Sequence, residues 1–272
     1  MIYRTPFIVG VFFLTASLLP ILAAAQIPTD GNNTAPVEIS ADKSLVWNRA
    51  AKTFTAKDRV VAKKDTAEIH CDTLTAAYDD KSGGMKIQSM TADGHVTISS
   101  PPYTAYGDHA VYDVTTGNAT LTGQNLRIET ETEKLTSSEK IEYIGADDKA
   151  VARGRAVATK GTNQLTADTL TAFFDKDSTG KRITKKITAE GNVVIATEKE
   201  TINGKSGVYD VASQKATLEG PVRILQGDSW LEGTRATVDM KTGISQLFGD
   251  GNAATEGRVR GVFYPGKTPT KP

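Results

Sequence analysis

The sequence has one cysteine, no excess of charge and few aromatic residues, and each shortage excludes a class of protein. Because Cys71 is the only cysteine among 272 residues, no disulfide can form within the chain, which excludes a disulfide-rich scaffold. The 32 basic residues balance the 32 acidic ones, so the charge gives no reason to expect binding to nucleic acid. Aromatic residues make up 7% of the chain, whereas 24 glycines and many Thr and Val residues indicate a β-rich, turn-rich protein.

The sequence also lacks the motifs of common active sites. The three histidines, His70, His95 and His109, show no HxH or HxxxH spacing, and the chain has no CxxC pair, so we expect no metal and no cofactor. GxSxG, P-loop and dinucleotide-binding motifs are missing as well. We therefore expect that the protein is not an enzyme, and that Cys71 is a buried strand residue.

Long hydrophobic runs are scarce, and the one present lies at the N-terminus. Phe7–Leu22 is almost wholly apolar, contains Pro20, and is short for a membrane span of about 20 residues. Arg4 precedes the run, and the small residues up to Ala25 are typical of a signal-peptide cleavage site. We expect residues 1–25 to be a cleaved signal peptide and the protein to be exported; an uncleaved membrane anchor is the alternative.

Internal repeats dominate the rest of the chain. An aromatic residue, usually followed by Asp, recurs about every 31 residues, a period typical of repeat architectures. These residues are Trp47, Tyr78, Tyr112, Tyr143, Phe174 and Tyr209. Longer phrases recur 96 or 97 residues apart: DTLTA at Asp72–Ala76 and Asp168–Ala172, and YDVTTGNATLTG at Tyr112–Gly123 as YDVASQKATLEG at Tyr209–Gly220. The chain is therefore internally duplicated.

Each repeat has the pattern of two strands. An extended run ends at the aromatic residue, a polar turn follows, and a glycine separates two segments in which apolar and polar residues alternate. We interpret DTLTA as a strand start. The sequence predicts an all-β fold of about seven two-stranded repeats in two facing antiparallel sheets of about seven strands each. We expect this domain to cover residues 37–264, between a flexible lead-in (26–36) and a disordered tail (265–272).

Recurring aspartates offer one enzymatic alternative, because paired carboxylates are typical of glycosidases. They are Asp79, Asp113, Asp175, Asp210 and Asp239. A catalytic pair should be unique within a repeat array, whereas these occupy the same place in successive repeats, just before a turn. Turn formation by Asp explains them better.

The alternating apolar positions are the remaining candidate site. They are Val96, Ile98, Leu126, Ile128, Val193, Ile195, Val222 and Ile224. They form either an ordinary closed core or an apolar groove between the sheets that accepts acyl chains. The end strands form a second candidate site, because unpaired strand edges pair with other chains. We expect Val37, Ile39, Ala236, Val238 and Leu247 to lie on these assembly edges.

The sequence resembles the OstA-like family of periplasmic lipopolysaccharide transport proteins. The resemblance rests on the N-terminal segment, on PVEISADKSLVWNRAAKTFTAKDRVVAKK (Pro36–Lys64), and on units of the form YDVxxxxATLxGxVxI. It implies a β-jellyroll with an apolar groove that binds the lipid A acyl chains of lipopolysaccharide. It also implies a periplasmic location, end-to-end self-association, and contact with OstA-like domains of an inner-membrane export complex and of the outer-membrane translocon.

Two other functions remain open. The chain could be the membrane-anchored inner-membrane partner of the same system, which would retain its N-terminal helix. It could also be a structural exported β-repeat protein without lipid cargo.

Overall fold

The computed structural model describes residues 37–80, 84–180, 182–239, 241–242, 244–250 and 258–264. The predicted signal peptide, lead-in and tail lie outside the described residues. Within these ranges every regular element is a β-strand except a single 3₁₀ turn at Gly145–Asp147. None of the described residues forms a helix that could cross a membrane. The all-β prediction is confirmed.

The strands are β1 (Glu38–Ser40), β2 (Ser44–Asn48), β3 (Thr53–Lys64), β4 (Ala67–Asp79), β5 (Lys86–Ser100), β6 (Tyr103–Asp113), β7 (Asn118–Thr122), β8 (Leu126–Glu129), β9 (Glu133–Ser137), β10 (Lys140–Ile144), β11 (Lys149–Lys160), β12 (Asn163–Lys176), β13 (Arg182–Ala196), β14 (Thr201–Asp210), β15 (Lys215–Gln226), β16 (Ser229–Asp239), β17 (Ile244–Phe248) and β18 (Arg260–Val262). The long ones are rich in Thr, Val and Ala, which favour a pleated, half-buried surface.

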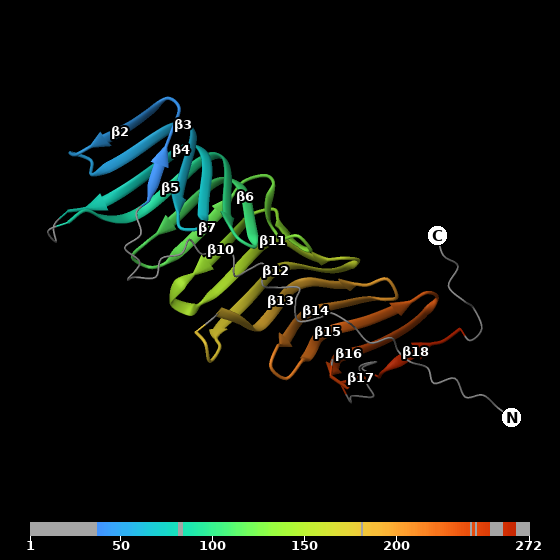
Figure 1. Cartoon of the computed structure of the whole chain (residues 1–272). Helices are drawn as coiled ribbons and strands as arrows, with labels where there is room; N and C mark the ends of the chain where they lie inside the picture. Colours follow the sequence, from blue (N-terminus) through green and yellow to red (C-terminus); the bar gives the residue numbers. More distant parts are fainter. Residues whose placement is uncertain are drawn as a thin grey trace.

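The strands pair in chain order, and every pairing is antiparallel. Short strands come in pairs that share one neighbour: β1 and β2 on β3, β7 and β8 on β6, β9 and β10 on β11, and β17 and β18 on β16. With each such pair counted as one rung beside the ten long strands, the stack has fourteen rungs, as seven two-stranded repeats predict. Figure 1 shows them following one another along one long axis, from β2 at one end to β17 and β18 at the other.

Each long strand bends near its middle. Eight of the pairings contain a register break there, for example between Lys57 and Val60 of β3. β2 pairs with β3 before its break and β1 pairs with β3 after it, so the halves of one strand belong to two layers. β-Bulges of this kind bend a strand and turn its direction. The apolar residues of both layers pack into one core cluster.

Two details differ from the sequence-based expectation. Gly94 and Gly191 do not separate two strands; each lies at the bulge inside one long strand. Asp72 and Asp168, which open the DTLTA phrases, lie in the middle of β4 and β12 and not at a strand start. Each layer therefore receives one half of all fourteen rungs, not seven separate strands.

Candidate functional site

The bends form a closed corner on one side of the stack. Asp72 of β4 accepts a hydrogen bond from Nδ1 of His95 across the bulge, at 2.8 Å. In the second copy, Nδ2 of Asn192 donates to Asp168 at 2.9 Å. Gly94 and Gly191 face these carboxylates with positive φ, and a Cβ on either would lie 2.1 Å from the Asp Oδ2. Glycine is required here for both reasons.

The inward faces of the two layers form an apolar interior of buried side chains, which we call the trough. All eight predicted lining residues lie on it: Ile98 is half-buried against the core, and the other seven are at most 9% exposed. The structure thus brings together the apolar residues that the alternation predicts to share a face. Their role in binding lipid stays a prediction.

Burial along the trough is most complete in the middle of the stack. Seven residues there are fully buried, and most are alanines: Leu135, Ala150, Ala152, Ala156, Ala158, Leu170 and Ala172, each 0% exposed. We call this group the waist. Two small cavities of about 40 and 50 Å³ lie inside the trough, one on either side of the waist.

The largest described cavity opens near the N-terminal end and measures about 430 Å³. It lies between the β3–β4 hairpin of one layer and the ends of β5 and β6 in the other. We call it the mouth, and it is lined by Val37, Ala62, Lys63, Lys64, Ala67, Ile69, Lys86, Ile87, Gln88, Met90, Ile98, Ser100, Val114 and Thr115. Its interior is apolar and its edge carries lysines.

The recurring aromatic residues lie along the open rim of the trough, opposite the corner. Tyr78, Tyr112, Tyr143 and Phe174 are 4–6% exposed. The aspartates that follow them organise the rim turns: carboxylate oxygens of Asp113, Asp210 and Asp239 accept backbone N–H bonds from Thr116, Ser213 and Thr242 at 2.8–2.9 Å. The backbone bonds lower the pKa of Asp113 and Asp239, and a hydrogen bond from the Ser213 hydroxyl, together with the backbone bond, lowers the pKa of Asp210. This confirms the turn interpretation for these three.

Two rim clusters occupy equivalent places 96 residues apart. In the first, Trp47 Nε1 donates to Tyr78 Oη at 2.8 Å, and the Phe54 ring packs on both aromatic neighbours. In the second, Tyr143, Ala150 and Phe174 replace these residues in the same strand register. Burial and hydrogen bonding to Asp148 raise the pKa of Tyr143 to about 12.

Arg182 occupies the second cluster where the first has a phenyl ring. Its guanidinium lies 5.0 Å from the Tyr143 ring centre and 5.5 Å from that of Phe174. It pairs with Asp148 at 2.9 Å and donates to Tyr143 Oη at 2.8 Å. No motif in the sequence pointed to Arg182, which occupies the place in the second copy that Met85 occupies in the first, 97 residues earlier.

Two buried glutamates at the opposite rim were also not predicted from the sequence. Glu133 and Glu200 close turns of the same geometry, in which the backbone N–H of each donates to a threonine Oγ1 at 3.1 Å. Glu133 pairs with Lys160 at 2.9 Å, whereas Oε1 of Glu200 is buried without a hydrogen-bond partner. Burial raises the pKa of Glu200. The sequence did contain a signal for its burial: Glu200 lies two residues before Ile202, whose side chain points inward, so the alternation places both on the inward face.

The predicted assembly residues divide into two groups. Val37 is exposed, and Ile39 and Leu247 are half-buried on terminal strands. Ala236 and Val238 lie on β16, which is paired on both sides, and are only 3% and 4% exposed, so they belong to the interior rather than to an end strand. A part in assembly stays a prediction for all five.

Polar groups elsewhere offer little chemistry. Cys71 is buried, as predicted, and burial raises the pKa of its thiol to about 11, which disfavours the reactive thiolate. His70, His95 and His109 each contact one carboxylate on the exposed surface. Within the described ranges, no three His, Cys, Asp or Glu side chains gather as a metal site would require.

Comparison with known proteins decides the family. The family model described as "LptA/(LptD N-terminal domain) LPS transport protein" matches residues 38–146 and again residues 137–244. The chain belongs to this family. The two matches divide the stack near the waist, so the LptA/LptD N-terminal unit is present twice. Members of the family are lipopolysaccharide transport proteins.

One similar solved structure is that of LptH from Pseudomonas aeruginosa, described as "the LptA homologous periplasmic component of the conserved lipopolysaccharide transport device". The two sequences are 20% identical, and the match covers 49% of this chain and 95% of that one, with a TM-score of 0.39. No curated protein matches the sequence.

Proposed function

We propose that this chain is a periplasmic lipopolysaccharide-binding transport protein whose trough shields the acyl chains of lipid A from water. The observation that carries the proposal is the continuous apolar inward face, which opens at a mouth of about 430 Å³. Burying apolar surface releases about 25 cal/mol per Å², so acyl chains would favour the trough over the aqueous periplasm. Membership of the family supports lipopolysaccharide as the cargo. Transport of this kind needs no covalent step.

The ends of the stack support the second part of the proposal, a bridge between inner and outer membranes. β2 and β17 each pair with one described strand only, and large apolar side chains on them are exposed: Leu45 by 59%, Val46 by 51%, and Ile244 by 57%. Open strand edges of this kind accept a further strand from another chain. Further copies, or OstA-like domains of the inner-membrane complex and the outer-membrane translocon, would supply that strand.

The test is lipopolysaccharide capture by the purified protein. Ile195→Asp places an unpaired charge in the trough, which costs several kcal/mol, on the order of 3, and should abolish capture. Ile183→Asp is the matched control, because Ile183 lies on the same strand and is 45% exposed. Thermal unfolding must show that both variants are folded. Wild-type capture by folded Ile195→Asp would contradict the proposal.

A structural protein without cargo gives a different result. Lipid extraction and mass spectrometry of the exported wild-type protein would then find no bound lipopolysaccharide, and none would be captured in vitro. N-terminal sequencing separates the periplasmic protein from a membrane-anchored partner.

A further inference from the structure

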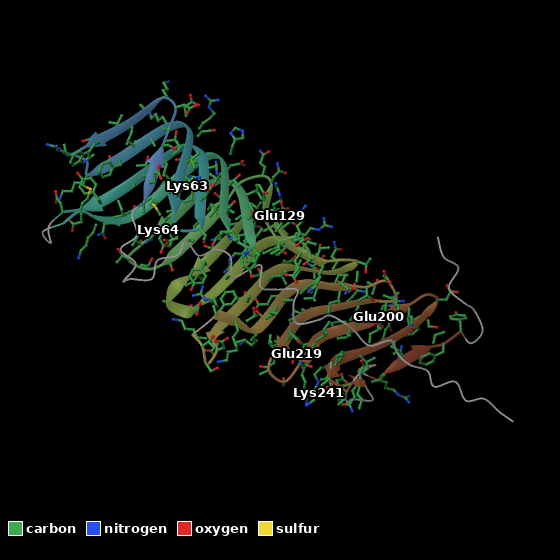
Figure 2. The ribbon with its side chains drawn as sticks, in the orientation of Figure 1. Lys63, Lys64, Glu129, Glu200, Glu219 and Lys241 are labelled. Atoms are coloured by element: carbon green, nitrogen blue, oxygen red, sulfur yellow. The ribbon has the colours of Figure 1, made fainter. Side chains whose placement is uncertain are left out.

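The mouth is basic as well as apolar. Its charged lining residues are Lys63, Lys64 and Lys86, and none of its described lining residues is acidic. Lys63 and Lys64, both labelled in Figure 2, lie at the end of β3. An opening with an apolar floor and a cationic edge is complementary to a molecule with alkyl chains and an anionic head.

Two of the three lysines are available to a ligand. Nζ of Lys63 lies 2.9 Å from Glu68, and this hydrogen bond raises the lysine pKa. Lys64 and Lys86, in contrast, form no ion pair with any described residue. Asp79 is the cross-strand partner of Lys86, but its carboxylate lies 3.7 Å from Nζ of Lys52.

The position of Lys64 suits a head-group contact. It continues the inward series of Val60 and Ala62 on β3 and is half-buried. Its methylene chain therefore covers the edge of the cavity while the ammonium group reaches water, as lysines at apolar surfaces do. An anionic group held there would leave its alkyl chains over Ile69 and Met90, inside the mouth.

The far end of the stack lacks this charge pattern. Its opening of about 390 Å³ is lined by one lysine and one aspartate, Lys215 and Asp239, whose charged atoms lie 3.8 Å apart. The rim of that half also holds the unpartnered Glu200. Of these two openings, the N-terminal mouth carries lysines without a described carboxylate partner, whereas the lysine of the far opening is paired.

We infer that the mouth is the docking site for the head of a phosphate-bearing amphiphile, with Lys64 and Lys86 holding the phosphate and the alkyl chains lying inward on Ile69, Met90 and Ile98. This inference rests on the proposed function and adds to it a place for the head and an orientation for the chains. Lysine ammonium groups bind phosphate as point charges, so binding should weaken as salt rises.

The test measures binding of dodecyl phosphate and of neutral dodecyl maltoside to the full-length protein, each below its critical micelle concentration. Lys64→Gln/Lys86→Gln should weaken dodecyl phosphate about tenfold, since two charge-assisted contacts are lost, and should leave dodecyl maltoside unchanged. Lys215→Gln/Lys241→Gln is the matched control, with the same change of charge at the far end. It should bind both probes as the wild type does. Inorganic phosphate alone should bind far more weakly than dodecyl phosphate.

The outcomes separate this inference from the proposed function. If both probes bind and Lys64→Gln/Lys86→Gln retains wild-type affinity for dodecyl phosphate, the head site is wrong while acyl binding stands. Inorganic phosphate that binds as tightly as dodecyl phosphate would identify an anion site without an alkyl component, which also overturns the inference. Failure of both probes to bind the wild type would count against the proposed function itself.

Discussion

In the first copy of the repeat, three aromatic rings fill the rim: Trp47, Phe54 and Tyr78. In the second, the phenyl ring is replaced by Ala150, and the guanidinium of Arg182 lies on the two remaining rings. Strand register is the same in both copies, and Phe54 and Ala150 each face the first aromatic residue of their cluster. The repeat therefore fixes the same backbone arrangement in both clusters, whereas the individual side chains decide how each cluster is packed. In the first cluster the rings contact one another, and in the second the guanidinium pairs with Asp148.

The largest effect is expected when the missing ring is restored to the second cluster. Ala150→Phe should destabilise the protein by about 3 kcal/mol, because the ring would enter the space that Arg182 occupies. Combined with Arg182→Ala, it should cost less than the two single changes added together. Urea unfolding of the three variants measures this coupling. Strictly additive free energies would show that ring and guanidinium do not share the space.

The corners should respond alike in both copies. Gly94→Ala and Gly191→Ala should each cost about 2 kcal/mol, because each adds backbone strain at positive φ and a clash with an Asp carboxylate. Gly180→Ala is the control: its φ is +82° and no atom lies within 4 Å of the added Cβ, so only the strain remains. Thermal unfolding gives the three values. A clear difference between Gly94→Ala and Gly191→Ala would show that the corners are not equivalent.

The buried glutamates should respond in opposite directions. Glu133→Gln should lower stability at neutral pH by about 1 kcal/mol, since Lys160 loses its partner, whereas Glu200→Gln should raise it by about as much, since an unsatisfied buried carboxylate is removed. The folded-state pKa of Glu200 is raised, so wild-type stability falls as pH rises through that value. The benefit of Glu200→Gln should therefore vanish in acid. Chemical unfolding at several pH values checks both signs.

The smallest effect is expected at the first corner, which has His95 where the second has Asn192. Hydrogen bonding to Asp72 raises the pKa of His95. The protonated ring thus stabilises the fold below the ordinary histidine pKa of 6.5, and this contribution is lost as pH rises through the raised value. His95→Asn should flatten the pH dependence of the melting temperature. An unchanged profile would show that the exposed pair contributes nothing.

Periodicity was enough to predict the stack, because a repeat of about 31 residues and alternating apolar positions constrain the buried face. It could not locate the corners. Val193 and Ile195 alternate in the same way whether Gly191 starts a strand or bulges within one, and Asp72 and His95 meet only after folding. Arg182 and Glu200 were not predicted for another reason. In the sequence, a polar residue at an inward position cannot be told from an exposed one until its neighbours are known.

The hydrogen-bonded ladder has one further consequence. Among the described residues, backbone pairing joins each rung only to the rungs beside it, so the molecule should behave approximately as a one-dimensional array whose stability is mainly a sum of neighbour terms. Loss of structure should begin at β2 and at β17, where one neighbour is missing, and travel toward the alanine-rich centre. A partner strand that pairs with either end would prevent that fraying. Docking should therefore stabilise the whole protein against unfolding.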